Sequence, residues 1–396
     1  MQNEVLVAGV GMTPFKKPGD NLPYPDMASL AVRQALQDAG CTYADVQEVY
    51  AGYVYGDSTC GQRAVYDVGM TGVPIVNVNN NCASGSTALY LARKAIASGS
   101  ADCVLAVGFE QMGRGALRST WNDRPNPLER FDAVIDDLFT YPELSSAVRY
   151  FAAAGQEYMQ RYGTSLETFA KVRAKASRHA ARNPLAVFRD EVTPEQVLAS
   201  SAIVPGVLTR LMACPPTCGA AAALLVSRDF ARRHGLDPRV RILAQALATD
   251  KPDVFESRSA ISVVGYDMSR DAARQVYEAA GVDPTDVDVC ELHDCFAQNE
   301  VLSYETLGLC GEGEAEKFVR AGDNTYGGAV VVNPSGGLLS KGHPLGATGL
   351  AQCHELTHQL RGTAQDRQVK GARLGLQHNG GLGGATVVTL YGQTHG

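Results

Sequence analysis

The stretch Ala31–Val46, AVRQALQDAGCTYADV, decides the fold of this chain because a second copy of it lies far along the sequence. Residues Ala272–Val287 read AARQVYEAAGVDPTDV, and both copies keep Ala, Arg, Gln, Ala, Gly, Asp and Val at aligned positions. Each copy is typical of an amphipathic helix that ends at a glycine, Gly40 or Gly281, and leads through a turn into a strand. An internal repeat of this kind predicts two related halves.

A fainter repeat pairs Cys82–Leu89, CASGSTAL, with His343–Leu350, HPLGATGL, which share glycine, threonine and leucine at the same places. Each stretch follows a β-rich run, and each opens a helix that is rich in small residues. If a pseudo-two-fold axis relates the halves, Cys82 and His343 occupy equivalent helix N-termini. They would then face each other across that axis.

Strands and helices alternate in both halves, which predicts α/β layers with largely parallel sheets. A region richer in charge and aromatic residues interrupts the first half, and helices are expected there over 146–161 and 166–183. We expect this region to be an inserted loop domain. The predicted bounds are 1–114 plus 217–237 for the N-terminal half, 115–216 for the insertion and 238–396 for the C-terminal half.

Length, charge and composition argue against several classes of function. The 396 residues are too many for one small core. The formal net charge of −7 argues against a surface that binds nucleic acid. No apolar run reaches the ~20 residues that a membrane span needs, so we expect no stable membrane insertion.

The chain ends and the cysteines bear on the cellular compartment. Residues 1–4 carry no basic region of a secretory signal, and Thr394-His395-Gly396 is not a peroxisomal address. The ten cysteines do not show the spacing of a disulfide framework, so we expect reduced thiols in a cytosol-like compartment. The composition, rich in alanine and arginine, favours a bacterial source and hence the cytoplasm.

Cys82 is the first candidate for chemistry. It follows the asparagine run Asn79–Asn81 and precedes small residues, which suits a sharp strand-to-helix turn. The N–H groups and the dipole at a helix N-terminus can lower a thiol pKa from ~8.5 toward ~3.5–7.5 and so supply a thiolate nucleophile. The alternative is a buried cysteine that packs like a small hydrophobic residue.

His343 is a second candidate. Gly342 before it permits a tight turn, and Pro344 after it fits the first position of a helix. A neutral His343 could accept the proton of Cys82 or donate a hydrogen bond to an oxyanion. The alternative is a polar residue that caps the helix.

His293 and Cys295 are two residues apart at the end of a predicted strand, so their side chains should point to the same side. One could polarise a carbonyl while the other moves a proton. The rival interpretation is metal binding by this pair, but no second pair with the spacing of a zinc site accompanies it. Cys214 and Cys218 lack a partner pair too, and we interpret them as structural.

The segment Gln377–Ala385, QHNGGLGGA, is predicted to be a glycine-rich loop before a final strand. Bare glycines let backbone N–H groups approach a developing oxyanion, with a plain tight turn as the alternative. The segment lacks the dinucleotide fingerprint, and the chain lacks a Walker pattern. We therefore do not expect a phosphate cradle.

Together these segments resemble the thiolase superfamily, and within it the sterol carrier protein X type, over essentially the whole chain. The resemblance lies in the order of the motifs 56–63 GDSTCGQR, 79–86 NNNCASGS, 293–296 HDCF, 322–328 GDNTYGG, 333–337 NPSGG, 342–349 GHPLGATG and 378–385 HNGGLGGA. It implies an α/β thiolase fold. Two duplicated βαβαβαββ-type halves would form a five-layer αβαβα sandwich with an inserted loop domain.

The resemblance also implies residue roles. Cys82 would become acylated, His343 would activate it, and Cys295 would exchange a proton with the α-carbon of the substrate. His293 and His343 would form a first oxyanion hole. The backbone N–H groups of Cys82 and Gly380 would form a second.

The last glycine-rich segment departs from many thiolases, which carry their acid/base cysteine there. This sequence has His378 at that place, as a neighbour in the same loop. The departure is typical of the subgroup in which the cysteine of the HDCF motif substitutes. It supports Cys295 as the acid/base residue.

The implied function is that of an acyl-CoA C-acyltransferase, a 3-ketoacyl-CoA thiolase that cleaves 3-oxoacyl-CoA or runs the reverse Claisen condensation. Such an enzyme would act in fatty acid or sterol side-chain degradation. Coenzyme A and acyl-CoA would be its substrates, with Arg118 as a candidate contact, and no metal or permanently bound cofactor is expected. We expect a homodimer or a homotetramer. Eukaryotic relatives are peroxisomal.

Two alternatives differ in what they require of the site. A steroid side-chain retro-aldolase with a partner protein needs no acyl-cysteine, so the complete set of two cysteines and two histidines argues against it. A non-catalytic acyl-CoA or lipid carrier has no use for two reactive cysteines. Relatives known for lipid transfer carry a further sterol-binding domain, which we expect this chain to lack.

Overall fold

Both copies of the repeat fold in the same way in the computed structural model, which describes residues 3–113, 121, 123–141 and 143–394. A helix ends at a glycine in the left-handed conformation, Gly40 (φ 71°) or Gly281 (φ 65°), as predicted. A 3-10 turn and a strand follow. The elements are α1 (Tyr24–Ala39) with β2 (Glu48–Gly52) and α11 (Tyr266–Ala280) with β9 (Val289–Glu291).

One ten-stranded sheet runs through both halves in the order β10-β9-β11-β12-β8-β1-β7-β4-β2-β3. The halves join where β1 (Val5–Met12) pairs with β8 (Val240–Ala248). The other strands of the first half are β3 (Ile75–Val78), β4 (Cys103–Glu110) and β7 (Gly219–Ser227). Those of the second half are β10 (Val331–Val332), β11 (Leu374–Gly381) and β12 (Ala385–Gln393).

The sheet is mixed, so the prediction of largely parallel strands is wrong in part. β2 pairs in parallel with β3 and β4, and β9 pairs in parallel with β10 and β11. In contrast, β7 and β12 run antiparallel to their neighbours. A parallel pair needs a crossover connection, whereas β11 and β12 are joined by a short turn, which forces the antiparallel direction.

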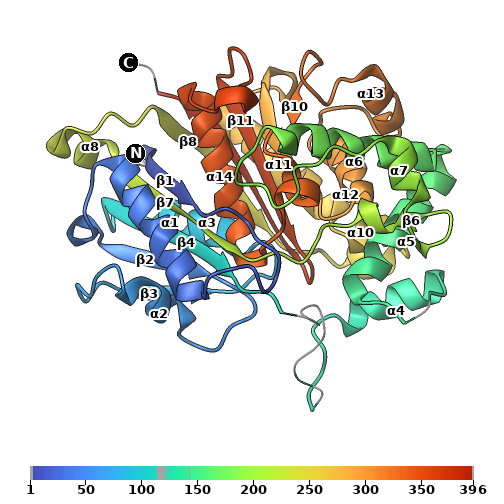
Figure 1. Ribbon diagram of the computed structural model, residues 1–396, viewed down its shortest axis with the longest axis horizontal. Helices are drawn as coiled ribbons and strands as arrows, with labels where there is room; N and C mark the ends of the chain where they lie inside the picture. Colours follow the sequence, from blue (N-terminus) through green and yellow to red (C-terminus); the bar gives the residue numbers. More distant parts are fainter. Residues whose placement is uncertain (1–2, 114–120, 122, 142, 395–396) are drawn as a thin grey trace.

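Five layers result, in the order αβαβα. The central helices α3 (Ser84–Ser98) and α14 (Leu345–Arg361) pack on each other and lie between the two half-sheets. The outer helix α1 covers β1 and β7, and α11 covers β8 and β12 (Figure 1). The central helices meet where they begin, because a Cβ atom on Gly85 would lie 2.5 Å from the carbonyl oxygen of Gly346. The predicted meeting of two equivalent helix N-termini is confirmed.

A mainly helical region lies between β4 and β7 and packs against the second half, at the right of Figure 1. It contains α4 (Glu129–Leu138), α5 (Ser146–Tyr162), α6 (Leu166–Ala181), α7 (Pro194–Ala199), β5 (Ala202–Val204) and β6 (Leu208–Thr209). The two predicted helices correspond to α5 and α6. The domain bounds stay a prediction, and Arg118 lies outside the described residues.

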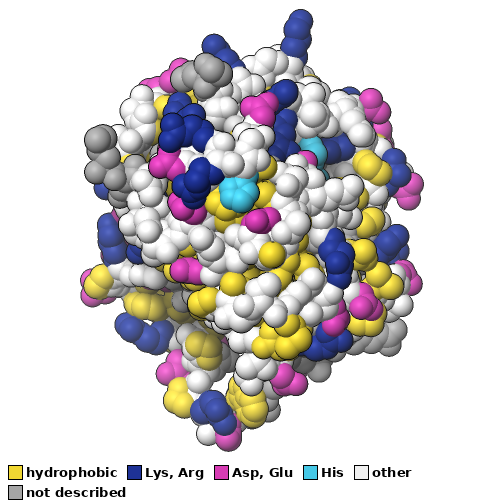
Figure 2. Space-filling view, turned by 90° about the vertical axis from the view of Figure 1, so that its left-hand side faces the viewer, with side chains coloured by type: hydrophobic (Ala, Val, Ile, Leu, Met, Phe, Trp, Pro, Cys, Tyr) yellow, Lys and Arg dark blue, Asp and Glu magenta, His cyan; other side chains and the backbone are white. Residues whose placement is uncertain are grey.

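The remaining helices are short, apart from α12, which packs against the insertion. They are α2 (Cys60–Tyr66), α8 (Arg228–His234), α9 (Asp253–Glu256), α10 (Ala260–Val263), α12 (Ala297–Thr306) and α13 (Ala315–Ala321). Within the described ranges, no helix has the length and apolar character of a membrane span. Figure 2 shows basic side chains interspersed with acidic ones on one face, and surface pairs such as Arg233–Asp102 fit this mixture.

Candidate active site

Cys82 lies in a sharp turn between β3 and α3. Asn81 before it adopts a left-handed conformation (φ 50°), and α3 begins at Ser84. The turn lies against the β11–β12 hairpin, since a Cβ atom on Gly381 would come within 2.2 Å of the Asn80 carbonyl oxygen. Glycine at this position therefore lets the hairpin reach the turn that carries Cys82.

One pocket brings the predicted residues of both halves together. Cys82, His293, Cys295, His343, His378 and Gly380 all line a cavity of about 1010 Å³, counting its part that is open to solvent. Much of the rest of its wall is apolar and includes Phe151, Val263, Met268, Phe296, Leu302 and Leu345. The site therefore combines a reactive end with space for an apolar group.

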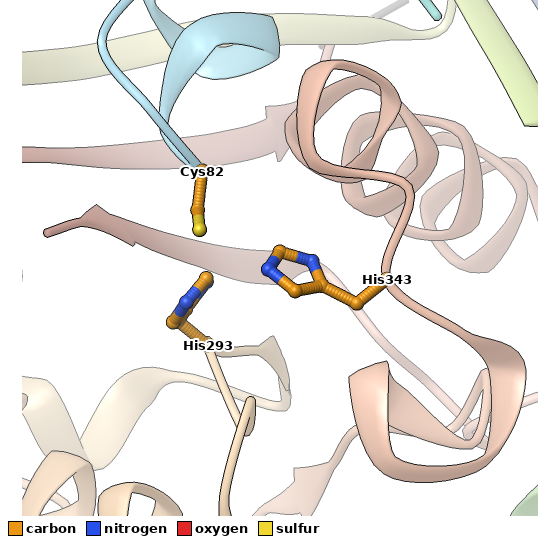
Figure 3. Close-up of side chains that lie close together, drawn as sticks. All are labelled: Cys82, His293 and His343. Atoms are coloured by element: carbon orange, nitrogen blue, oxygen red, sulfur yellow. The ribbon is translucent and has the colours of Figure 1, made fainter. Parts of the chain in front are cut away.

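Three side chains form the centre of the pocket (Figure 3). The sulfur of Cys82 and one ring nitrogen each of His293 and His343 lie within 4.8 Å of one another. The two imidazole rings meet edge to face, with centroids 5.1 Å apart. Cys295 lines the same pocket but does not belong to this close cluster. Burial and the neighbouring Cys214 hold the pKa of the Cys295 thiol well above its usual range.

The hydroxyl of Thr348 sets the tautomer of His343. Thr348 donates its only hydroxyl proton to the carbonyl oxygen of Pro344 (2.9 Å), so its oxygen accepts from Nδ1–H of His343 (2.7 Å). Burial lowers the pKa of His343 to about 3, which keeps the ring neutral. Its Nε2 therefore carries a lone pair. This buried nitrogen has no hydrogen-bond partner in the described part of the chain, and Figure 3 shows the ring turned toward Cys82.

His293 has the opposite tautomer. The side-chain amide of Asn379 donates from Nδ2 to Nδ1 of His293 (3.0 Å). Burial, with the nearby His343, holds the pKa of His293 well below its usual range, so the ring is neutral. Its proton must then lie on Nε2. The site thus has one imidazole that can accept a proton and one that can donate a hydrogen bond.

Cys82 rests as a thiol. Burial and the nearby carboxylate of Glu110 raise the pKa of Cys82 to about 12, although the backbone N–H groups of Cys82 and Leu382 oppose this shift. The prediction of a lowered pKa is therefore wrong, because removal of the sulfur from solvent outweighs the effect of the helix N-terminus. A neutral thiol needs a base, and Nε2 of His343 is placed to act as one.

The central cluster does not fit a metal ion as it stands. A metal would need a lone pair from each imidazole, but the Nδ1 lone pair of His293 already accepts from Asn379 and its Nε2 carries the proton. The cluster that the structure forms is Cys82 with His293 and His343. It is not the pair of His293 and Cys295 that the sequence suggested for zinc.

The glycine-rich segment is mostly strand, which corrects the predicted loop. Gln377–Gly381 belongs to β11, and only the turn before Ala385 lies outside the ladder with β12. His378 bonds to Ser269 through Nε2 (3.0 Å), and burial lowers the pKa of this histidine to about 4. The glycines let the hairpin approach the Cys82 turn, so their composition does not mark a long loop.

The residues next to His343 agree with the sequence prediction only in part. Pro344 is the N-cap of α14 rather than its first residue, so the helix begins one position later than predicted. Gly342 has φ 116°, which confirms the tight turn before His343.

The backbone N–H groups of Leu338 and Leu339, in the segment just before Gly342, bond to the buried carboxylate of Asp294. Asp294 therefore ties the His293 turn to the segment that leads into His343.

Sequence reasoning missed several residues of the site. Cys214, interpreted as structural, lines the pocket beside the other two cysteines. Asn379 and Thr348 set the histidine tautomers. Thr348 is the one that a sequence signal could reveal, because a hydroxyl on the first turn of a helix can reach a histidine just before it. Asn379 lies far from His293 in sequence, and no local pattern connects them.

Glu110 is a buried acid behind Cys82. Its carboxylate accepts from the backbone N–H groups of Val54 (3.1 Å), Tyr55 (2.9 Å) and Gly346 (3.0 Å), yet burial raises the pKa of Glu110 to about 7. It thereby joins the end of β4 to the start of α14. At neutral pH the carboxyl group of Glu110 is therefore partly protonated.

We expect Glu110 to make stability fall as the pH rises. A pKa raised from 4.5 to about 7 in the folded state favours folding below pH 4.5, and this contribution disappears as the pH rises through 7. Relative to Glu110→Gln, wild type should lose about 3 kcal/mol of unfolding free energy across that window. Urea unfolding of both proteins at pH 4.5, 6 and 8 tests this. A constant difference would contradict it.

Comparisons with known proteins give consistent matches. The family descriptions "Thiolase, N-terminal domain" and "Thiolase C-terminal domain-like" match residues 5–204 and 254–393. Sterol carrier protein 2 of Gallus gallus is 54% identical over 394 residues, which are 99% of this chain and 72% of that protein. Acetyl-CoA acetyltransferase of Methanothermobacter thermautotrophicus is 35% identical over 395 residues, 98% of this chain and 99% of that protein.

Solved structures share the fold. An Ltp2-ChsH2(DUF35) aldolase has a TM-score of 0.84 at 23% identity, over 98% of both chains. Human mitochondrial 3-ketoacyl-CoA thiolase in complex with CoA has a TM-score of 0.74 at 20% identity, over 99% of this chain and 98% of that one. The relatives at 53–54% identity include proteins of Gallus gallus and Rattus norvegicus, so the comparisons give no support to a bacterial source.

Proposed function

Because this chain belongs to the thiolase family of acyltransferases, we propose that it cleaves 3-oxoacyl-CoA by thiolysis, or runs the reverse Claisen condensation. The reaction passes through an acyl group on Cys82. The observation that carries this proposal is a pair of contacts, His343 Nδ1 to Thr348 and His293 Nδ1 to Asn379, from which opposite tautomers follow for the two histidines beside the thiol. One presents a lone pair for the Cys82 proton, and the other presents an N–H for a developing oxyanion.

The first half-reaction follows from this arrangement. His343 Nε2 takes the proton of Cys82, and the sulfur attacks the 3-keto carbon of the substrate. When the C2–C3 bond breaks, its electron pair passes into an enolate whose oxygen accepts from Nε2–H of His293. Cys295 gives its proton to C2, and acetyl-CoA leaves. In the second half-reaction the Cys295 thiolate takes the thiol proton of CoA, and the CoA sulfur displaces Cys82 from the acyl group. Protonated His343 returns its proton to the departing Cys82 sulfur, so all three side chains regain their starting states.

The rest of the pocket supports this sequence of steps. The backbone N–H groups of Cys82 and Gly380 are proposed as the second oxyanion hole, for the tetrahedral intermediate on C3. His378 borders the same space. The apolar wall suits the acyl chain, because an apolar surface binds a hydrocarbon without leaving buried polar groups unpaired. Coenzyme A and acyl-CoA act as substrates, and the proposed steps use no bound metal or cofactor.

A direct assay tests this function. Purified protein is incubated with CoA and short, medium or long 3-oxoacyl-CoAs, and the products are separated by chromatography. We expect acetyl-CoA together with an acyl-CoA shortened by two carbons. If none of these substrates is consumed, or if cleavage proceeds without CoA, the proposal is overturned. Aldehyde or ketone products would instead indicate the retro-aldolase, for which the shared fold alone gives no support.

We also propose that the chain forms homodimers through strand β3, which is the edge strand of the ten-stranded sheet in the first half. An edge strand exposes unpaired backbone groups, and here Val76 on β3 is 45% exposed and nearby Met70 is 75% exposed. A second copy could cover this edge.

We propose a reducing compartment such as the cytoplasm, where the ten free cysteines would stay reduced.

Replacing Val76 tests the dimer. Val76→Asp should place like charges at the junction of two β3 strands and shift the protein to a monomer, measured by light scattering. Leu198→Asp is the matched control, because Leu198 is also an exposed apolar residue (37%) but lies on α7. A dimer that persists in Val76→Asp would show that the interface lies elsewhere.

A further inference from the structure

A chain of buried polar side chains runs from the core of the second half to His293. It consists of Tyr391, Gln377, Ser86, Asn379 and His293, and it includes one residue of the first half, Ser86. The first four are completely buried and His293 is 3% exposed. Buried hydrogen-bonded groups of this kind restrict each other's orientation, because each unmet bond is costly.

The direction of the chain is fixed at Gln377. Its Nε2 donates to the backbone carbonyl of Gly349 (2.7 Å), which can only accept, and its Oε1 accepts from the hydroxyl of Tyr391. The same Nε2 donates to Ser86 Oγ (2.9 Å). The amide group of Gln377 therefore cannot be turned round without losing the bond to the carbonyl.

Each later link follows from the one before. Because Ser86 Oγ accepts from Gln377, its single proton goes to Oδ1 of Asn379 (2.8 Å). Asn379 must then present its Nδ2 to His293, where it donates to Nδ1 (3.0 Å). Because Nδ1 accepts this hydrogen bond, a neutral His293 must carry its proton on Nε2.

Gly349 shows how closely this chain is packed. A Cβ atom there would lie 2.0 Å from Ser86 Oγ and 2.8 Å from Asn379 Oδ1. A side chain on this turn of α14 would displace both middle links. The series of hydrogen bonds from Tyr391 to His293 therefore requires glycine at position 349.

We propose that Asn379 and Ser86 are positioning residues that hold His293 as a hydrogen-bond donor and prevent it from acting as a base. This inference rests on the proposed thiolase function and adds to it a division of labour between the two histidines. His343 accepts protons and His293 stabilises the enolate oxygen. The hydrogen-bond direction that separates these roles is fixed at Gln377, whose Nε2 donates to the backbone carbonyl of Gly349 in the opposite half from Ser86.

The wild-type protein provides a first test that needs no variant. Nitrogen-15 NMR of protein labelled in histidine, with His293 assigned from the spectrum of His293→Gln, distinguishes a protonated from an unprotonated ring nitrogen. We expect protonated Nε2 and unprotonated Nδ1 at neutral pH. Protonated Nδ1 would overturn the proposal regardless of whether the enzyme is a thiolase.

Asn379→Asp provides the second test, because a carboxylate can only accept and will draw the His293 proton to Nδ1. Nε2 then loses its proton at high pH, and kcat for thiolysis should fall about 10²–10³-fold, as when one oxyanion donor is removed. As the pH falls, the imidazolium forms beside the carboxylate and Nε2–H returns, so kcat should recover. Ser86→Ala, which frees Asn379 to turn, should give a smaller loss.

A matched control separates this role from a structural one. Asn183→Asp also buries a carboxylate, since Asn183 is 1% exposed and bonds to the carbonyl of Ser335, but it lies outside the pocket. It should create no new pH dependence of kcat. An equal loss at every pH in Asn379→Asp, with Nδ1 still unprotonated, would overturn the proposal. Failure of the thiolase function itself would appear separately, as absence of any acyl group on Cys82 in wild type.

Discussion

Cys82→Ser should lower kcat for thiolysis by about 10⁴-fold or more, the scale seen when a covalent nucleophile is removed. The hydroxyl is a far weaker nucleophile than the thiol, and it keeps nearly the same volume in the turn before α3. The pocket should therefore still bind 3-oxoacyl-CoA. Steady-state rates with CoA, and binding of the substrate measured by calorimetry, give the two quantities.

A second half-buried cysteine serves as the control for this variant. Cys41 is also half-buried, but it follows α1 and does not line the pocket. Cys41→Ser should retain the wild-type rate. If Cys82→Ser kept more than a tenth of the wild-type kcat, the covalent mechanism would be wrong.

His343→Asn should lower kcat/KM about 10²–10⁴-fold, the range for a general base. The reason is the neutral resting state of the pair, in which the pKa of Cys82 is about 12 and that of His343 is about 3. Between these values the wild type should show no titration of either group. Without the base, the reaction depends on the small thiolate fraction, so kcat/KM of the variant should rise about tenfold per pH unit.

The measurement is kcat/KM from pH 6 to about 9 for both proteins. His358→Asn is the control, because His358 lies on the same helix, α14, bonds to Thr363 (2.8 Å) and is not part of the pocket wall. A fast, pH-independent reaction in His343→Asn would show that Cys82 is already a thiolate. The helix N-terminus would then outweigh burial after all.

Local signals in the sequence predicted the duplicated fold. The helix of Ala31–Val46 ends at Gly40, and its copy ends at Gly281, because only glycine enters the left-handed conformation easily. The pairing of Cys82 with His343 followed from the second repeat, and the close contact of Gly85 with Gly346 realises it. These features depend on short stretches of chain, so they can be read without coordinates.

Other features of the site depend on contacts between distant residues. The sequence around Cys82 indicates a helix N-terminus, but the carboxylate of Glu110 and the burial of the sulfur decide its pKa. The glycines after Asn379 suggested a loop, although they serve the close approach of β11 to Asn80. The tautomer of His293 depends on Ser86, which no spacing rule connects to it.

The central claim is that Cys82 carries an acyl group during the reaction. Intact-protein mass spectrometry after incubation with acetyl-CoA or a 3-oxoacyl-CoA, without free CoA, tests it most directly. We predict one acyl group per chain, located on Cys82 by peptide mapping, discharged when CoA is added, and absent from Cys82→Ser. An acyl group on another residue, or none with any thioester that the protein cleaves, would contradict the account.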